Sequence, residues 1–255
     1  MKVFDAYAAY YDLIYRDKDY AGEAEYVMKL IRKFKPDAKT ILDLGCGTGK
    51  HDLCFAGENF EVTGVELSEN MTIAANKCLQ SDTVANLKLK FIKGDIRSIR
   101  LAEKFDAITS LFHVLNYQTT NEDLRATLRT IKDHLKDDGK FICDFWYGPA
   151  VLNDRPEERI KKIKNNEYEL ERLAIPEMLV NENIVNVHYK IFVREFKSGE
   201  AKEINETHRM RYFFLPEIEL LLSELDMKTE HFEEWMTGNV LSDKSWFALA
   251  VIGNK

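Results

Sequence analysis

A glycine-rich stretch at residues 43–49, with the sequence DLGCGTG, constrains the fold of this chain more than any other feature. The apolar run at 41–44 predicts a buried strand that leads through the glycines into a helix. Three glycines within five residues allow positive φ angles and a close approach to a bulky group where a side chain would clash. A turn of this kind after the first parallel strand is where doubly wound α/β folds bind the nucleoside part of a cofactor.

Apolar runs and amphipathic segments alternate on either side of this turn. Ser68 is a suitable N-cap for one of the helices, and the sequence DDG at 137–139 predicts a turn. We expect strands at 41–44, 60–67, 88–93, 105–112 and 140–145, and helices at 20–35, 49–57, 69–80 and 121–135. Strands that alternate with helices predict a parallel sheet covered by helices on both faces.

The pattern changes after residue 150. Residues 167–180, 183–195 and 203–214 read as strands without intervening helices, and a hairpin turn is expected at 196–200. A helix at 216–225 and strands at 227–235 and 244–252 then return to the first pattern. We therefore expect a single domain over 1–255. Its parts are an N-terminal lid with helices at 1–35, a core at 36–148, an antiparallel insertion at 150–215 and a C-terminal part of the core at 216–255.

The N-terminal arm is dense in tyrosine. Its spacing suits a short amphipathic helix lying on a larger body, and a stronger helix should follow and end before Pro36. The arm either packs as an aromatic cover or acts as a lid whose hydroxyl groups line a polar pocket. The tyrosines concerned are Tyr7, Tyr10, Tyr11, Tyr15 and Tyr20.

Composition excludes several classes of function. A net charge of −7 argues against a surface built to neutralise phosphates, so no nucleic-acid partner is expected. The apolar runs are far shorter than the ~20 residues of a membrane-spanning helix, and the N-terminal sequence lacks the features of a signal peptide. The four cysteines form no CxxC pair, which indicates reduced thiols in the cytoplasm and neither a disulfide framework nor a metal site.

The spacing of the glycines distinguishes between two nucleoside cofactors. Dinucleotide-binding folds require G-x-G-x-x-G, whereas residues 45–49 read G-x-G-x-G. The sequence VELS follows, with Glu66 about 20 residues beyond the glycines, where an acid can accept both hydroxyls of a ribose. With the sequence GD at 94–95, these motifs resemble class I methyltransferases that use S-adenosylmethionine (SAM). The resemblance covers roughly residues 36–145.

This resemblance implies a Rossmann-like, mostly parallel sheet of seven strands with helices on both faces. It also implies SAM as cofactor, S-adenosylhomocysteine (SAH) as product, and no metal. The glycines would surround the methionine moiety, Asp43 would hold its amino group, Glu66 the ribose and Asp95 the adenine amino group. The full set implied for the cofactor is Tyr11, Tyr15, Lys18, Asp43, Leu44, Gly45, Cys46, Gly47, Gly49, Glu66, Leu67, Met71, Asp95, Ile96 and Leu111.

A narrower resemblance concerns the acceptor of the methyl group. The arm sequence YDLIYRDKDY, the sequence SLFHVLNY at 110–117 and the sequence DFWYGP at 144–149 are similar to those of nucleotide-sugar N-methyltransferases. This implies methyl transfer to nitrogen or oxygen of a small polar metabolite, with a nucleotide-linked aminosugar as the best candidate. The residues implied to contact the substrate are Tyr15, His113, Asn116, Tyr117, Trp146 and Tyr147.

The chemistry requires an aligned acceptor, exclusion of water and one base that works near neutral pH. His113 follows the fourth strand at the edge where ligands bind in open α/β sheets, so it is either this base or a histidine packed under the lid. Tyr15 is expected to orient the acceptor or to lie against the sulfonium. His188 and His208, both in the insertion, are expected to be exposed to solvent.

Two other functions stay open at this point. A nucleic-acid or protein methyltransferase is one, although the residues after strand four are Phe112, His113 and Val114 in place of the Pro-Pro-aromatic motif common in enzymes that methylate exocyclic amines. A protein that binds SAM without turnover is the other, since it would carry the same glycines and acids. The chain is expected to be a monomer or a homodimer.

Overall fold

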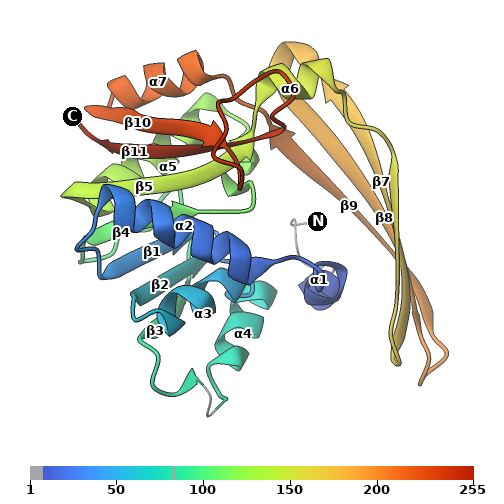
Figure 1. The fold of residues 1–255 in the computed structure, drawn as a ribbon. Coiled ribbons are helices and arrows are strands. Elements are labelled where there is room, and N and C mark those ends of the chain that lie inside the picture. The colour runs from blue at the N-terminus through green and yellow to red at the C-terminus, as the bar shows by residue number, and fades with distance from the viewer. Residues whose placement is uncertain (1–7, 82–83) are drawn as a thin grey trace.

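The computed structural model describes residues 8–81 and 84–255, so Tyr7 of the predicted lid lies outside the described residues. A seven-stranded sheet forms the centre, in the order β10-β11-β5-β4-β1-β2-β3 (Figure 1). Its strands from β1 to β5 are parallel, and β11 runs antiparallel to both of its neighbours. The strands are β1 Thr40–Leu44, β2 Glu61–Glu66, β3 Leu89–Lys93, β4 Phe105–Ser110, β5 Leu135–Trp146, β10 Met227–Glu234 and β11 Phe247–Asn254. The Rossmann-like fold expected from the sequence is confirmed.

Helices cover both faces of this sheet. Helices α2 (Tyr20–Phe34) and α3 (Lys50–Gly57) share one buried apolar cluster with the sheet, and α5 (Asn121–His134) and α7 (Leu215–Ser223) share another. Helix α4 (Glu69–Cys78) packs beside β3, and the side chain of Ser68 caps it by accepting a hydrogen bond from the Met71 amide at 3.4 Å. No helix in the described residues is long and apolar enough to cross a membrane.

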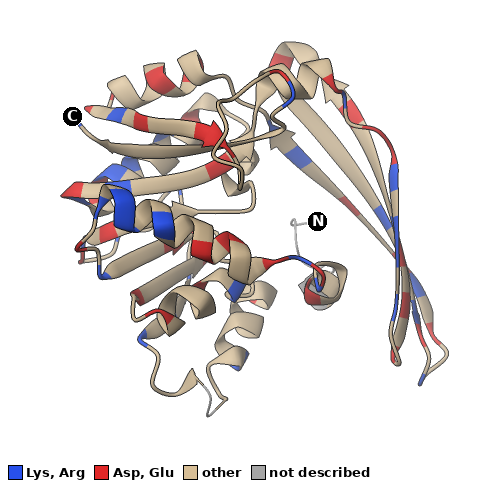
Figure 2. Ribbon diagram, viewed as in Figure 1, with Lys and Arg blue, Asp and Glu red and all other residues tan. Residues whose placement is uncertain are grey.

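The insertion is a separate antiparallel sheet that extends away from the core (Figure 1). Its strands are β6 Arg159–Lys164, β7 Tyr168–Leu179, β8 Ile184–Glu195 and β9 Ala201–Arg211, and the short helices α6 (Gly148–Asn153) and η3 (Val180–Glu182) accompany them. The sequence predicts three strands here, so β6 and α6 are additions. Strand β6 lies at one edge of the sheet, and only Ile163 of its residues is buried, so its sequence RIKKIK shows no alternation of apolar and polar residues. The strands of the insertion sheet carry charges of both signs (Figure 2).

Strand β5 begins earlier than the sequence predicts. Leu135 already pairs with Phe105 of β4, and the regular register resumes where Lys140 pairs with Ala107. The expected turn at 137–139 is therefore an irregularity within β5. The prediction that the strand begins only after a turn was wrong, because Leu135 already pairs with β4 and residues 137–139 bulge out between the two paired positions.

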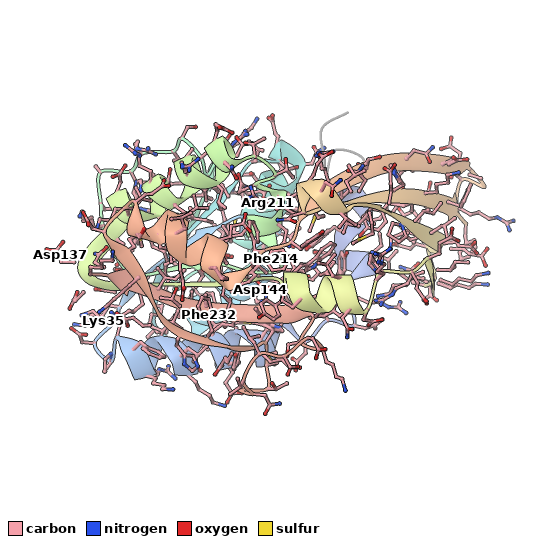
Figure 3. The ribbon with its side chains drawn as sticks, turned by 90° about the horizontal axis from the view of Figure 1, so that it is seen from above. Lys35, Asp137, Asp144, Arg211, Phe214 and Phe232 are labelled. Atoms are coloured by element: carbon pink, nitrogen blue, oxygen red, sulfur yellow. The ribbon has the colours of Figure 1, made fainter. Side chains whose placement is uncertain are left out.

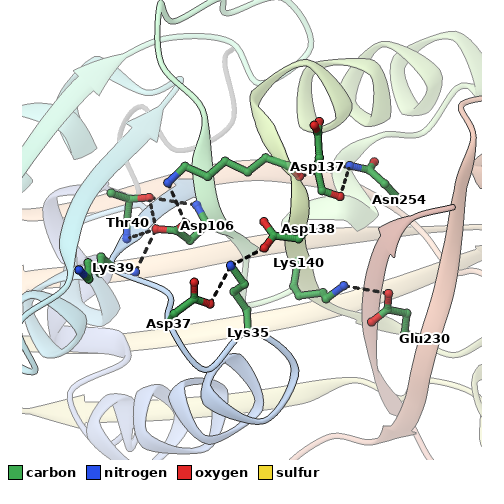
Figure 4. Close-up of polar contacts among 11 residues, drawn as sticks. Lys35, Asp37, Lys39, Thr40, Asp106, Asp137, Asp138, Lys140, Glu230 and Asn254 are labelled. Carbon is green, nitrogen blue, oxygen red and sulfur yellow. Dashed lines mark hydrogen bonds and ion pairs between the residues drawn. The ribbon is translucent and has the colours of Figure 1, made fainter.

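A polar network closes the edge of the sheet where β1 and β4 begin (Figure 4). The Asp106 carboxylate accepts hydrogen bonds from the amides of Lys39 and Thr40, each at 3.0 Å, and from the Lys136 ammonium at 2.7 Å. Burial opposes the charge of Asp106, but these donors outweigh burial and lower its pKa to about 2. Because side chains occupy this edge, the opposite edge, where the glycine turn lies, is the one left for ligands.

Helix α1 (Ala8–Ile14) connects the two sheets and lies between them in Figure 1. Tyr10 and Ile14 are buried against the inner face of the insertion, in one cluster with apolar residues of β6 to β9. The Asp12 carboxylate accepts a hydrogen bond from the Thr48 hydroxyl at 2.8 Å and pairs with the Lys50 ammonium at 3.3 Å. The predicted lid is thus attached both to the insertion and to the glycine turn.

Candidate active site

The glycine turn has a backbone that other residues adopt only with strain. Gly45, Gly47 and Gly49 have φ angles of +89°, +58° and +77°. A Cβ atom added at Gly45 would lie 2.5 Å from Val114, and one at Gly49 would lie 2.3 Å from Phe91, whereas one at Gly47 would meet nothing within 4 Å. The turn is therefore packed on both flanks and open in the middle, where a ligand can approach the backbone.

Glu66, at the end of β2, faces this open part of the turn. Its carboxylate accepts hydrogen bonds from the Gly47 amide at 3.0 Å and from the Ser68 amide at 2.7 Å. Burial raises the pKa of Glu66, although both amides favour the charged form. A carboxylate offers about four lone pairs, so two are left for the neighbouring hydroxyls of a ribose. The residue fits the role implied by the sequence.

Asp43 is buried at the end of β1 and accepts a hydrogen bond from the Thr109 hydroxyl at 2.7 Å. Asp52, in the first turn of α3, is fully buried next to it. Burial raises the pKa of both carboxyl groups, and the charge of Asp43 raises that of Asp52 further. Asp52 is therefore the protonated member of the pair, and Asp43 is the carboxylate that can meet a cationic amino group.

Asp95 follows β3 and is held by Arg97. Its carboxylate accepts hydrogen bonds from the Arg97 amide at 2.9 Å and from two nitrogens of the guanidinium at 2.9 and 2.6 Å. Arg97 also binds Asp123 at 2.8 Å, and this cation holds the pKa of Asp95 below its usual value. Three donors leave about one lone pair of Asp95 for an adenine amino group.

A single cavity of about 1200 Å³ extends from the glycine turn to the inner face of the insertion. Fifteen of the residues predicted to contact cofactor or substrate line it. They are Tyr11, Tyr15, Asp43, Gly45, Cys46, Gly47, Glu66, Leu67, Met71, Asp95, Ile96, Leu111, His113, Tyr117 and Trp146. Among residues 8–81 and 84–255, no cluster of three or more His, Cys, Asp or Glu side chains is arranged to hold a metal ion.

Three residues predicted for the cofactor lie outside the cavity lining. The Leu44 side chain is fully buried in the core, and Gly49 is the N-cap of α3. Lys18 forms an ion pair with Glu23, and its ammonium lies 4.3 Å from the centre of the Phe112 ring. These residues support the walls of the cavity and do not line it.

Two residues predicted for the substrate also lie elsewhere. Asn116 is fully buried, and its amide donates to the carbonyl of Arg211 at 2.6 Å and accepts from the Trp146 amide at 3.4 Å. Tyr147 is the N-cap of α6 and forms an isolated β-bridge with Phe213. Both residues join the insertion to the core. The sequence signal was misleading because these residues flank true lining residues in the chain.

His113 lies at the end of β4 in a left-handed conformation, with φ of +65°. Its Nδ1 lies 2.5 Å from the Asp144 carboxylate, and its ring stacks on Phe247 with centroids 4.6 Å apart. Asp144 is buried in the interior (Figure 3), and although burial opposes its charge, His113 holds the pKa of Asp144 below its usual value. Because Nδ1 faces a carboxylate, it carries the proton, and Nε2 is the nitrogen that can accept one.

Tyr15 connects the lid to the insertion. Its hydroxyl accepts a hydrogen bond from the Arg172 guanidinium of β7 at 3.1 Å, and its ring contacts those of Tyr11 and Phe112 at 4.7 and 5.1 Å. Tyr15 therefore lines the cavity between the glycine turn and the insertion.

The insertion contributes lining residues that the sequence did not reveal, among them Arg172, Tyr189 and His208. The prediction that His208 is exposed was wrong, since 3% of its surface is accessible, whereas His188 has an exposed side chain as expected. The signal that could have found His208 is the alternation in β9, where every second residue is buried from Ile204 onwards. Other lining residues missed are Tyr20, Thr48, His51, Arg97, Phe112, Trp246 and Phe247.

Part of the core resembles a known family. Residues 41–139 match the family model described as a methyltransferase domain. Beyond it lie the lid, the insertion and the C-terminal strands, which complete the cavity.

Two curated relatives of this chain are named as aminosugar N,N-dimethyltransferases. Over 150 residues, 58% of this chain, it is 37% identical to the dTDP-3-amino-3,4,6-trideoxy-alpha-D-glucopyranose N,N-dimethyltransferase of Streptomyces venezuelae, of which the match covers 60%. It is 37% identical over 150 residues to the dTDP-4-amino-2,3,4,6-tetradeoxy-D-glucose N,N-dimethyltransferase of Saccharopolyspora spinosa, covering 57% of that protein. The matches therefore span less than two thirds of either relative.

Solved structures extend the similarity to nearly the whole chain. The crystal structure of Streptomyces venezuelae DesVI is 26% identical, with a TM-score of 0.80, and the alignment covers 97% of this chain and 98% of that one. A SAM-dependent methyltransferase from Clostridium acetobutylicum has the same TM-score of 0.80 at 21% identity, which shows a shared fold.

Proposed function

We propose that this methyltransferase moves methyl groups from SAM to the amino group of a nucleotide-linked aminosugar. The observation that carries the proposal is the single cavity, which the glycine turn and Glu66 line at one end and the insertion at the other. Ligand pockets usually measure about 300–1,000 Å³, so the cavity's volume of about 1200 Å³ suits two ligands held together. The aminosugar activities named for the curated relatives favour an amine over a hydroxyl acceptor.

The cofactor fits the end of the cavity near the glycine turn. Glu66 would accept the ribose hydroxyls, Asp95 the adenine amino group, and Asp43 the amino group of the methionine moiety. Gly47 leaves its backbone accessible because nothing lies within 4 Å of its Cβ position. When bound, SAM supplies an electrophilic methyl group on a positively charged sulfur. The chain then has to bind both ligands, align the acceptor with the methyl carbon and exclude water.

The acceptor would occupy the end of the cavity near the insertion. Arg159 of β6 and Arg172 of β7 both line this cavity, and guanidinium groups are well suited to bind phosphate oxygens. Trp146 and Trp246 line it too, and they offer flat apolar surfaces to a sugar or a base. A charged nucleotide portion and a less polar sugar therefore both have matching walls.

In the reaction itself, an amine must be neutral when its lone pair attacks the methyl carbon. His113 can remove a proton through Nε2, because Asp144 holds its other nitrogen protonated. Tyr15 would orient the acceptor from the lid, and α1 would exclude water by closing the gap between the two sheets. We propose in addition that the protein acts in the cytoplasm and that it is a monomer or a homodimer.

The proposal is tested with purified protein, SAM and two acceptors named for the relatives, dTDP-3-amino-3,4,6-trideoxy-D-glucose and dTDP-4-amino-2,3,4,6-tetradeoxy-D-glucose. Mass spectrometry should detect a product that has gained one or two methyl groups. Calorimetry with SAM and SAH provides the control, since a folded sample that binds neither would refute the cofactor assignment. Binding without turnover would favour a non-catalytic SAM-binding protein. Salt-sensitive retention and methylation of tRNA would instead favour a nucleic-acid methyltransferase.

A further inference from the structure

Two ionisable residues occupy the inner face of β9 among apolar neighbours. Glu206 and His208 are 6% and 3% exposed, and the residues beside them on this face, Ile204 and Met210, are buried as well. His208 Nδ1 lies 2.8 Å from the hydroxyl of Tyr117, which comes from the short helix η2 (Val114–Tyr117) after β4. His208 Nε2 lies 3.4 Å from the Glu206 carboxylate. Tyr117 and His208 both line the cavity.

The partners of the imidazole determine its protonation. Opposite the ionised form of the Glu206 carboxylate, which only accepts hydrogen bonds, Nε2 carries a proton. Nδ1 is then an acceptor in the neutral ring, and the Tyr117 hydroxyl is the donor to it. The three residues thus form a chain in which each hydrogen bond points from the cavity towards Glu206.

Aromatic and charged groups surround these three residues. The Tyr189 ring of β8 lies 4.8 Å from the His208 ring, and the Arg172 guanidinium of β7 lies 5.1 Å from that of Tyr189. Burial raises the pKa of Tyr117 well above its usual value, and the negative charges of Glu206 and Glu66 and the hydroxyls of Tyr189 and Tyr15 add to this effect. The Tyr117 phenol therefore stays protonated. It can pass on a proton only if it releases its own proton to His208 while it takes up another from the cavity.

We propose that Tyr117, His208 and Glu206 form a proton relay that deprotonates the acceptor from the insertion side of the cavity. The inference rests on the proposed function and adds a second basic group to His113. Two buried ionisable side chains next to each other are a poor way to stabilise a fold, because apolar residues of similar size serve as well or better. Their position on a cavity wall, next to the hydroxyl group of Tyr117, gives them a catalytic use.

Deprotonation starts from an acceptor amine that arrives as an ammonium group. One N–H proton of this ammonium passes to the Tyr117 oxygen while the phenol proton passes to His208 Nδ1. The resulting imidazolium is stabilised by the Glu206 carboxylate. The freed nitrogen lone pair then forms the bond to the methyl carbon, and the electrons of the broken carbon–sulfur bond return to sulfur. Tyr117 is the residue that contacts the acceptor, and His208 and Glu206 act through it.

Variants with matched controls test the relay. His208→Asn should lower kcat at neutral pH by about 10²-fold, the usual scale of general-base catalysis. The kcat of this variant should fall more steeply than that of the wild type as the pH is lowered, because His113 is then the only base left to deprotonate the acceptor. His188→Asn is the control on the exposed face of the same sheet and should behave as the wild type. Tyr117→Phe should lower kcat as His208→Asn does. Glu206→Gln should also lower kcat, whereas Glu203→Gln, at an exposed position of the same strand, should leave it unchanged.

The outcomes separate the relay from the proposed function. A wild-type protein that methylates neither dTDP-aminosugar would refute the function. An active wild type whose His208→Asn variant keeps a parallel pH profile of kcat would refute the relay alone. Nitrogen-15 NMR of histidine-labelled protein with SAH decides the relay without turnover. The His208 ring should carry its proton on Nε2, and Tyr117→Phe should shift its Nδ1 signal. A proton found on Nδ1 in the neutral ring would overturn the inference.

Discussion

Replacement of Glu66 by glutamine tests the cofactor site most directly. The carboxylate accepts hydrogen bonds from the Gly47 and Ser68 amides on its two separate oxygens. A glutamine keeps the length of the side chain but has one oxygen and one NH2 group. One of the two amides would then face another donor, and the negative charge offered to the ribose would be lost.

The expected loss follows from the number of hydrogen bonds. With two lone pairs of Glu66 in use, two remain for the ribose hydroxyls, and glutamine retains an acceptor for one of them. A hydrogen bond to a charged group contributes about 1.5–3 kcal/mol. Since 1.4 kcal/mol corresponds to a tenfold change in affinity, Glu66→Gln should weaken SAM and SAH binding by about 10- to 150-fold.

Isothermal titration calorimetry with SAH measures this loss without the acceptor. Glu61→Gln is the control, because Glu61 is an exposed residue at the other end of the same strand and its carboxylate lies 4.0 Å from the Lys88 ammonium. An exposed substitution of this kind changes free energies by about 0.5 kcal/mol or less. If Glu66→Gln, with an unchanged thermal midpoint, binds SAH as tightly as Glu61→Gln does, the assignment of Glu66 to the ribose is refuted.

Gly49→Ala should lower the free energy of unfolding by about 1–3 kcal/mol in urea titrations, because its φ is positive and its Cβ would lie 2.3 Å from Phe91. Gly57→Ala, with nothing within 4 Å, is the control and should be neutral or stabilising. The pKa of Asp106 is lowered to about 2, so its charged form stabilises the fold fully above about pH 4, and this contribution is lost as the pH falls towards 2. Asp106→Asn should therefore cost stability at pH 7 and flatten the pH dependence between 4 and 2; an equal loss at pH 7 and pH 2 would contradict this. His113→Asn should lower kcat by about 10²- to 10⁴-fold without changing SAH affinity, and normal turnover would leave His113 a packing residue.

The position of the glycine turn, Glu66 and Asp95 around one end of the cavity was predictable because their signals are local in the chain. The glycine turn, Glu66 and Asp95 each follow a strand, and parallel strands bring their carboxyl ends to one edge without further information. The same logic placed His113 at the end of β4. What the motif could not show is the support behind it, such as Asp52 buried next to Asp43.

The acceptor end was less predictable because it depends on pairing between distant residues. Arg172 and Tyr189 meet at the lid only through the register of the insertion sheet, and His208 meets Tyr117 across 91 positions of the chain. The local amino-acid composition does not indicate which distant residues pair with one another. It also failed at β6, where only Ile163 is buried and the sequence RIKKIK does not alternate between apolar and polar residues.

The insertion leaves and re-enters the core at one place. The Phe213 amide donates to the Trp146 carbonyl at 3.0 Å, and the Gly148 amide donates to the Phe213 carbonyl at 2.8 Å. With its ends fastened together, the segment between them is closed irrespective of its length, and a longer or shorter one would cost the core little conformational entropy. The fold is in this sense modular. The insertion can therefore change in length or sequence while the sheet that carries the glycine turn keeps its pairing.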